Sequence, residues 1–136
     1  MSNARFAVSL HILTLLKRFE GEVLSSAFIA GSININPATV RKEIGNLKKQ
    51  GLVTSKEGKE GGTILAKPAQ AILLSEIYRA VKQTPLLGKN KNEPNPLCDV
   101  GRQINHHLDD LYKDVEEYLE RRLEKLTLAD FVRKFD

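Results

Sequence analysis

Basic and hydrogen-bonding side chains are concentrated between residues 36 and 68, where seven Lys and Arg stand against three Glu. Arg41 lies about one helical turn after a strong helix-capping residue, Asn36. A guanidinium can pair with a guanine edge through two hydrogen bonds, and small side chains such as Ala38 and Thr39 can contact a thymine methyl group. These residue types and their spacing indicate contacts with bases and phosphates rather than with a reacting substrate.

The helix that would present these side chains is predicted over residues 37–50. Asn36 is a favourable N-cap, and Pro37 at the first helical position costs no hydrogen bond. Gly51 is the expected left-handed residue after the helix ends. Apolar residues at steps of four and three define the face that we expect to be buried, namely Val40, Ile44 and Leu47. Arg41 and Lys42 fall on other faces and are expected to be available to a partner.

Two short strands, 52–56 and 63–67, are predicted to follow this helix as a hairpin. The turn between them, residues 57–62, is rich in glycine, which tolerates positive φ. Gly61 and Gly62 would let the hairpin tip approach a sugar-phosphate backbone closely. Lys56 and Lys59 would lie beside that backbone.

Two helices are predicted before this segment, over residues 3–19 and 26–31, the second capped by Ser25 or Ser26. The order helix, helix, turn, helix, strand, turn, strand predicts a mainly α fold with a small β-wing, a winged helix-turn-helix. Backbone N–H groups at the start of the second helix could hold phosphates. The predicted DNA-binding residues are Ser25, Ser26, Asn36, Ala38, Thr39, Arg41, Lys42, Lys56, Lys59, Gly61 and Gly62.

The second half of the chain is predicted to hold a helix over 74–83, a proline-containing loop over 84–99 and a long helix over 100–126. The long helix carries one narrow apolar stripe among many charges, which favours a partner helix and therefore a homodimer. Packing of this helix against the first helix of the same chain is the alternative. The expected divisions are a DNA-binding domain over 1–83, the loop over 84–99, and a dimerisation helix with its tail over 100–136.

Composition fits a soluble globular protein, with 41% hydrophobic and 28% charged residues. No apolar run reaches the roughly 20 residues that span a bilayer, and no secretory cleavage signal is evident, so we expect a cytoplasmic protein without membrane contact. Residues 1–68 carry ten Lys and Arg against five Asp and Glu, whereas 69–136 carry eleven against twelve. The excess positive charge therefore favours double-stranded DNA as a partner of the first half.

Cys98 is the only cysteine, which excludes an internal disulfide and a cysteine-rich zinc site. Two interpretations of Cys98 stay open: a redox or electrophile sensor, and a buried small residue that holds the loop to the long helix. The histidines show no metal-ligand spacing, and neither a phosphate-binding glycine loop nor a catalytic triad pattern is present. We therefore expect no catalysis, no metal and no cofactor. A separate expectation is an effector pocket between the DNA-binding head and the long helix, lined by Leu86, Leu87, residues 94–98 and Tyr78.

Several segments together resemble the Rrf-two (BadM-like) bacterial transcription regulators. The matching segments are 5–8, 24–30, 36–42, 47–55, 58–62 and 126–131, with the Gly-Leu-Val and Gly-x-x-Gly-Gly runs the most specific. The resemblance implies a dimer formed through the long helix on a pseudo-palindromic promoter site, most simply as a repressor. Members with an iron–sulfur cluster carry three closely spaced cysteines where this chain has Cys98 alone, so it resembles the branch without a cluster.

One feature departs from the pattern of the family. The family's usual wing arginine is replaced by Glu57, which argues against insertion of that position into the minor groove. The alternative function is a winged-helix protein–protein adaptor whose basic wing contacts an acidic partner. Sequence-selective protection of DNA would separate the two hypotheses.

Overall fold

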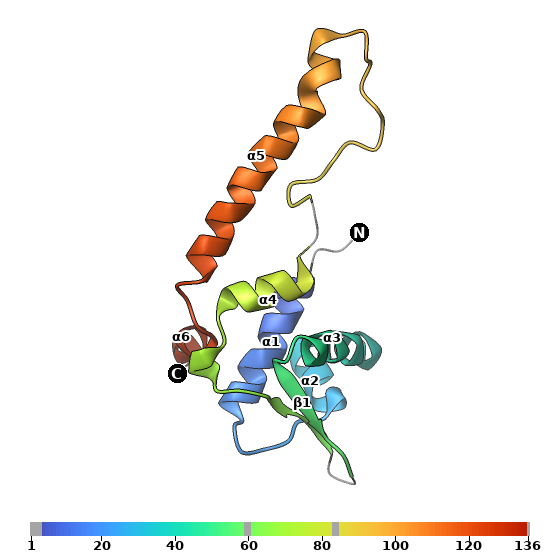
Figure 1. The fold of residues 1–136 in the computed structure, drawn as a ribbon. Coiled ribbons are helices and arrows are strands. Elements are labelled where there is room, and N and C mark those ends of the chain that lie inside the picture. The colour runs from blue at the N-terminus through green and yellow to red at the C-terminus, as the bar shows by residue number, and fades with distance from the viewer. Residues whose placement is uncertain (1–3, 59–60, 83–84, 136) are drawn as a thin grey trace.

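The computed structural model describes residues 4–58, 61–82 and 85–135. A head is built from five helices and a hairpin, and one long helix rises away from it (Figure 1). In chain order the elements are α1 (Arg5–Arg18), α2 (Ser26–Ile33), α3 (Pro37–Lys49), β1 (Val53–Lys56), β2 (Gly62–Leu65), a 3-10 turn (Ala69–Ala71), α4 (Leu74–Val81), α5 (Asp99–Leu123), α6 (Leu128–Val132) and a second 3-10 turn, η2 (Arg133–Phe135). The predicted fold class, mainly α with a small β-wing, is confirmed. Residues 3 and 83, the predicted ends of two helices, lie outside the described residues.

The predicted helix caps of the helix-turn-helix are present. The Ser25 Oγ accepts a hydrogen bond from the Phe28 N–H at 3.1 Å, and the Asn36 Oδ1 accepts one from the Ala38 N–H at 2.8 Å. The turn between α2 and α3 passes through Asn34 at φ 65°, a left-handed conformation that asparagine tolerates. Gly51 follows α3 at φ 77°, as expected. These local signals fix where α2 and α3 begin and end.

The wing is an antiparallel pair in which Val53 lies opposite Leu65 and Lys56 opposite Gly62. The observed bounds of both strands differ from the predicted bounds. The first begins at Val53 rather than at residue 52, because the Leu52 N–H still donates to the Leu47 carbonyl at the end of α3. The second begins at Gly62 and ends at Leu65, two residues earlier than predicted. Its Thr63 also pairs in both directions with Leu24, which adds the approach to α2 as a third line of backbone pairing.

The C-terminal segment turns back into the head. The predicted helix over 100–126 begins at Asp99 and ends at Leu123, because Thr127 caps a new helix, α6, together with Asp130. Leu128 is fully buried and Val132 is nearly so, both within the same core as α1, α3 and α4. The Leu128 N–H donates to the Ile72 carbonyl at 2.8 Å, and the Leu74 N–H donates to the Leu126 carbonyl at 2.9 Å. The tail is therefore part of the head.

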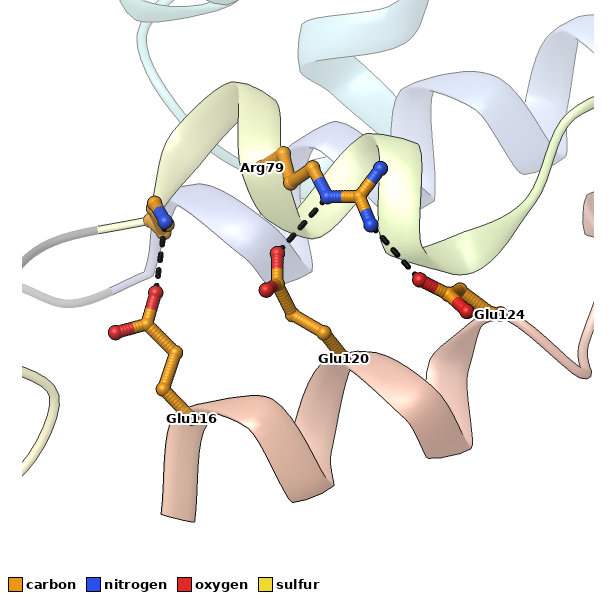
Figure 2. Close-up of polar contacts among 5 residues, drawn as sticks. Arg79, Glu116, Glu120 and Glu124 are labelled. Carbon is orange, nitrogen blue, oxygen red and sulfur yellow. Dashed lines mark hydrogen bonds and ion pairs between the residues drawn. The ribbon is translucent and has the colours of Figure 1, made fainter. Parts of the chain in front are cut away.

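Three ion pairs join the head to the long helix (Figure 2). Arg79 of α4 binds Glu120 and Glu124 at 2.9 Å each, and Lys82 binds Glu116 at 2.7 Å. The three carboxylates are four residues apart and so share one face of α5. The ion pair with Glu120 raises the pKa of Arg79 above its ordinary value.

No helix within the described ranges is long and apolar enough to cross a membrane.

Candidate nucleic-acid interface

A hollow of about 350 Å³ lies where the start of α2, the middle of α3 and the wing meet. It is lined by six of the eleven residues predicted to bind DNA: Ser25, Ser26, Arg41, Lys56, Gly61 and Gly62. The N-terminus of α2 carries the positive end of the helix dipole and unpaired backbone donors, which favour an anion. Arg41 and Lys56 add two cationic side chains from separate elements. The hollow therefore combines the groups that a backbone phosphate requires.

The remaining predicted residues are distributed around this hollow. Ala38, Thr39 and Lys42 are exposed on α3 but do not line it. The Asn36 side-chain oxygen accepts the capping hydrogen bond from the Ala38 N–H, so this side chain fixes where α3 begins. Lys59 lies outside the described residues. Ala38, Thr39 and Lys42 are therefore accessible on α3 next to the hollow, and their predicted contacts with DNA stay a prediction.

The orientation of α3 depends on two polar contacts that were not predicted from the sequence. Glu43 lies on the inner face, only 4% exposed, and forms a two-point ion pair with Arg5 at 2.8 and 3.1 Å. This contact raises the pKa of Arg5 above its ordinary value. Asn46 donates its side-chain N–H to the Ala80 carbonyl of α4 at 2.8 Å. Glu43 is three residues after Val40 and four before Leu47, so its helical position could have indicated burial.

The two wing glycines are required by contacts within the protein. A Cβ atom on Gly62 would lie 2.3 Å from the Leu24 carbonyl oxygen, and one on Gly61 would lie 2.5 Å from the Lys56 carbonyl oxygen. A side chain on Gly62 would force the wing away from the segment before α2, and one on Gly61 would collide with the backbone of the wing itself. Their predicted role, close approach to a sugar-phosphate backbone, stays a prediction. The packing alone explains why glycine occupies both positions.

Cys98 is exposed and precedes the first residue of α5 at the far end of the long helix (Figure 1). The segment before it folds back tightly, because the Cys98 N–H donates to the Asn95 carbonyl at 3.2 Å. A Cβ atom on Gly101 would lie 2.6 Å from that same carbonyl oxygen. The interpretation of Cys98 as a buried residue is therefore wrong, because its side chain is exposed at this tip. Its role as a redox sensor stays a prediction.

The predicted effector pocket is only partly formed. Tyr78 and Leu86 line a cavity of about 260 Å³ at the junction of head and long helix, together with residues of α1, α4 and α5. Leu87 and residues 94–98 do not line it, because the loop leaves the junction and runs along α5 to its far end (Figure 1). Burial raises the pKa of the Tyr78 hydroxyl above its ordinary value.

Comparison with known proteins shows the family to which the chain belongs. A family model described as Rrf2, iron-dependent transcriptional regulator, matches residues 2–134. The chain belongs to the Rrf2 family. It is the family that the sequence segments resembled, and its members are transcriptional regulators.

Two relatives within the Rrf2 family illustrate the range of similarity. The chain is 42% identical over 131 residues to YwnA of Bacillus subtilis, described as a candidate HTH-type transcriptional regulator, with 96% of each chain covered. It is 30% identical to the HTH-type transcriptional regulator IscR of Erwinia tasmaniensis, covering 96% of this chain and 76% of that protein.

Solved structures agree on the Rrf2 fold. The crystal structure of a candidate DNA binding protein, 38% identical, superposes with a TM-score of 0.74 and covers 93% of this chain and 97% of that one. CymR of B. subtilis, a global cysteine regulator, superposes with a TM-score of 0.71 at 22% identity, covering 100% of this chain and 98% of that one. The second likeness shows the shared fold alone.

The donor set of this Rrf2 chain does not fit an iron–sulfur cluster. Such clusters are held mainly by cysteine thiolates, usually four, and the sequence contains one cysteine. Cys98 is exposed at the tip of the long helix, and no group of three His, Cys, Asp or Glu side chains in the described ranges could hold a metal ion.

Proposed function

We propose that the chain is a sequence-specific DNA-binding repressor that acts in the cytoplasm as a homodimer on a pseudo-palindromic promoter site. The observation that carries this proposal is the hollow between α2, α3 and the wing, which gathers Arg41, Lys56 and the N-terminus of α2 beside the exposed face of α3. In a winged helix-turn-helix, the second helix of the motif enters the major groove with its N-terminal residues facing the bases.

Each proposed residue has a distinct task. Arg41 pairs with a guanine edge, while Ala38 and Thr39 contact thymine methyl groups, and these contacts select the sequence. Ser25, Ser26, Lys56 and the glycine tip hold the phosphate backbone, which adds affinity without sequence information. Lys42 lies beside Arg41 on the same exposed surface. Lys48 and Lys49 lie in the last turn of α3, where they stabilise the helix dipole.

The dimer is supported by the uncovered surface of the long helix. α5, all of which the structure describes, buries none of its 25 residues. Its apolar stripe is open, with Val100 67%, Leu111 52% and Tyr118 79% exposed. α4 covers only the C-terminal end of α5, so the alternative packing along α1 does not cover the stripe (Figure 1). A second copy of α5 would cover it and space two heads about one helical turn of DNA, ~34 Å, apart.

The test is selection of genomic fragments by the full-length protein, followed by footprinting of the enriched fragment. A repressor of this kind protects two half-sites with two-fold symmetry, and transcription from the adjoining promoter falls as protein is added. A protein–protein adaptor with a basic wing would instead shift all fragments weakly and protect none selectively. Sedimentation of the free protein at micromolar concentration measures the dimer independently of DNA.

A further inference from the structure

A third cavity, of about 580 Å³, lies on the head between α1, the last turn of α2 and the C-terminal segment. It shares no lining residue with the hollow at the wing or with the cavity at the head–helix junction. Its volume is within the range of about 300–1,000 Å³ typical of small-molecule sites. Neither the proposed DNA contacts nor the dimer uses it.

Aromatic rings form the walls of this cavity. Phe19 follows α1, Phe131 belongs to α6, and Phe135 belongs to η2. The rings of Phe131 and Phe135 are 5.4 Å apart and tilted by 59°. Phe19 is 38% and Phe135 49% exposed, so both rings have surface left for another contact. Aromatic rings favour edge-to-face and offset contacts with a further ring, an advantage that an aliphatic chain does not gain.

Four of the side chains that line the cavity are polar or charged, namely His11, Thr14, Arg18 and Ser32, and Arg18 already has an interaction within the protein. The His11 Nε2 lies 2.9 Å from the Ser32 Oγ, within hydrogen-bond distance, and both side chains line the cavity. Thr14, also in the lining, donates its hydroxyl to the Leu10 carbonyl and so has no donor left. A serine hydroxyl has one donor and two acceptor sites, so after its bond to His11 it can still bond a ligand hydroxyl.

We infer that this cavity binds a planar aromatic molecule of one or two rings that carries a hydroxyl group. The rings lie among the phenylalanines, and the hydroxyl bonds to the Ser32–His11 pair. Such a site goes beyond DNA binding. Ser32 is in the last turn of α2, two residues before Asn34 turns the chain toward α3, so the ligand would contact the helix-turn-helix directly. Any effect of the ligand on DNA affinity rests on the proposed function and is measured separately.

The experiment titrates the full-length protein with β-naphthol and follows the fluorescence of the naphthol, which tryptophan does not obscure because the chain has none. We expect saturable binding of one molecule per chain. Ser32→Ala should raise the Kd about fivefold, the effect of losing one neutral hydrogen bond. Phe135→Ala should raise it by a similar factor. Tyr112→Ala, which removes an aromatic residue of α5 that does not line the cavity, should leave the Kd unchanged.

Two further probes need no variant. β-Methylnaphthalene keeps the rings without the hydroxyl and should bind the wild-type protein about fivefold more weakly. Decanol keeps the hydroxyl without the rings and should fail to displace β-naphthol. Displacement by decanol at equal concentration would identify an acyl-chain site and overturn the proposal. Unsaturable binding, or an equal loss with Tyr112→Ala, would also overturn it.

DNA affinity is then measured with and without β-naphthol. Since the ligand titration contains no DNA, a failure of the proposed DNA binding leaves the result on the cavity intact. An unoccupied cavity would in turn leave the footprinting result intact.

Discussion

Arg5, the first residue of α1, holds Glu43 in the middle of α3 through two hydrogen bonds of 2.8 and 3.1 Å. The carboxylate is nearly buried, whereas the guanidinium is 37% exposed. The pair therefore fixes the rotation of the proposed recognition helix about its own axis. It turns Arg41 and Lys42 outward as it draws Glu43 inward.

Loss of Arg5 should destabilise the head, because Glu43 would be left as a buried charge without a partner. We expect Arg5→Ala to lower the free energy of unfolding by about 1–2 kcal/mol, a value reduced by the partial exposure of Arg5. The double variant Arg5→Met with Glu43→Leu should recover most of that loss, since no charge remains buried. Urea denaturation of all three proteins measures this. Equal loss in the single and double variants would show that packing, not the charge, is responsible.

Arg41 and Lys56 should differ in what their loss does to DNA binding. Arg41→Ala should cost about 1–3 kcal/mol on the specific site and relax the preference at one base pair. Lys56→Ala should weaken specific and random DNA alike and reduce the salt slope of binding by about 1. Titrations at several salt concentrations on both DNAs measure this. An equal effect of Arg41→Ala on both DNAs would remove it from the base-reading role.

Two glycines of the same domain should respond oppositely to alanine. Gly62→Ala places a Cβ atom 2.3 Å from the Leu24 carbonyl oxygen, so the wing must move and DNA affinity should fall along with stability. Gly45→Ala is the matched control, because a Cβ atom there meets nothing within 4 Å. In the middle of α3 it should stabilise the protein by about 0.5–1 kcal/mol. Melting temperatures and DNA titrations of the two variants test this contrast.

The open stripe of α5 should control assembly. Leu111→Glu introduces a charge at a position that is 52% exposed in the single chain and would be covered in a dimer. We expect the variant to sediment as a monomer and to lose affinity for a two-half-site operator while keeping its helical content. Glu117→Gln, an exposed change on the same helix, serves as the control. A Leu111→Glu protein that stays dimeric would move the interface elsewhere.

The attachment of α6 should weaken in acid. Asp130 accepts hydrogen bonds from the Thr127 backbone N–H and hydroxyl and also binds Arg133, and these contacts lower the pKa of its carboxyl. A depressed folded pKa adds stability that is fully present above the ordinary carboxyl value of about 3.9 and is lost as the pH falls through the folded pKa. Asp130→Asn should therefore flatten the stability profile below about pH 4. Melting curves at several pH values measure the difference, and an unchanged acid limb would contradict it.

Local signals in the sequence determined much of the head. The capping residues Ser25 and Asn36, the glycine at 51 and the apolar steps through Val40, Ile44 and Leu47 were predicted, and each is present. These features could be predicted because each depends on contacts within a few residues or on the period of a helix. They also defined the set of candidate DNA-binding residues and the family resemblance.

Only the tertiary structure decided which of those residues meet. The hollow joins Ser25, Arg41 and Lys56 across 32 residues of chain. The partner of Glu43 lies 38 residues away, and α6 closes onto a core formed by the first half. The aromatic cavity is likewise built from both ends of the chain. Pairings over such distances are selected by how whole elements pack, and helical periodicity carries no information about them. The sequence by itself therefore determined the helices of the head and their caps. Only the packing of these elements decided where the hollow and the aromatic cavity form.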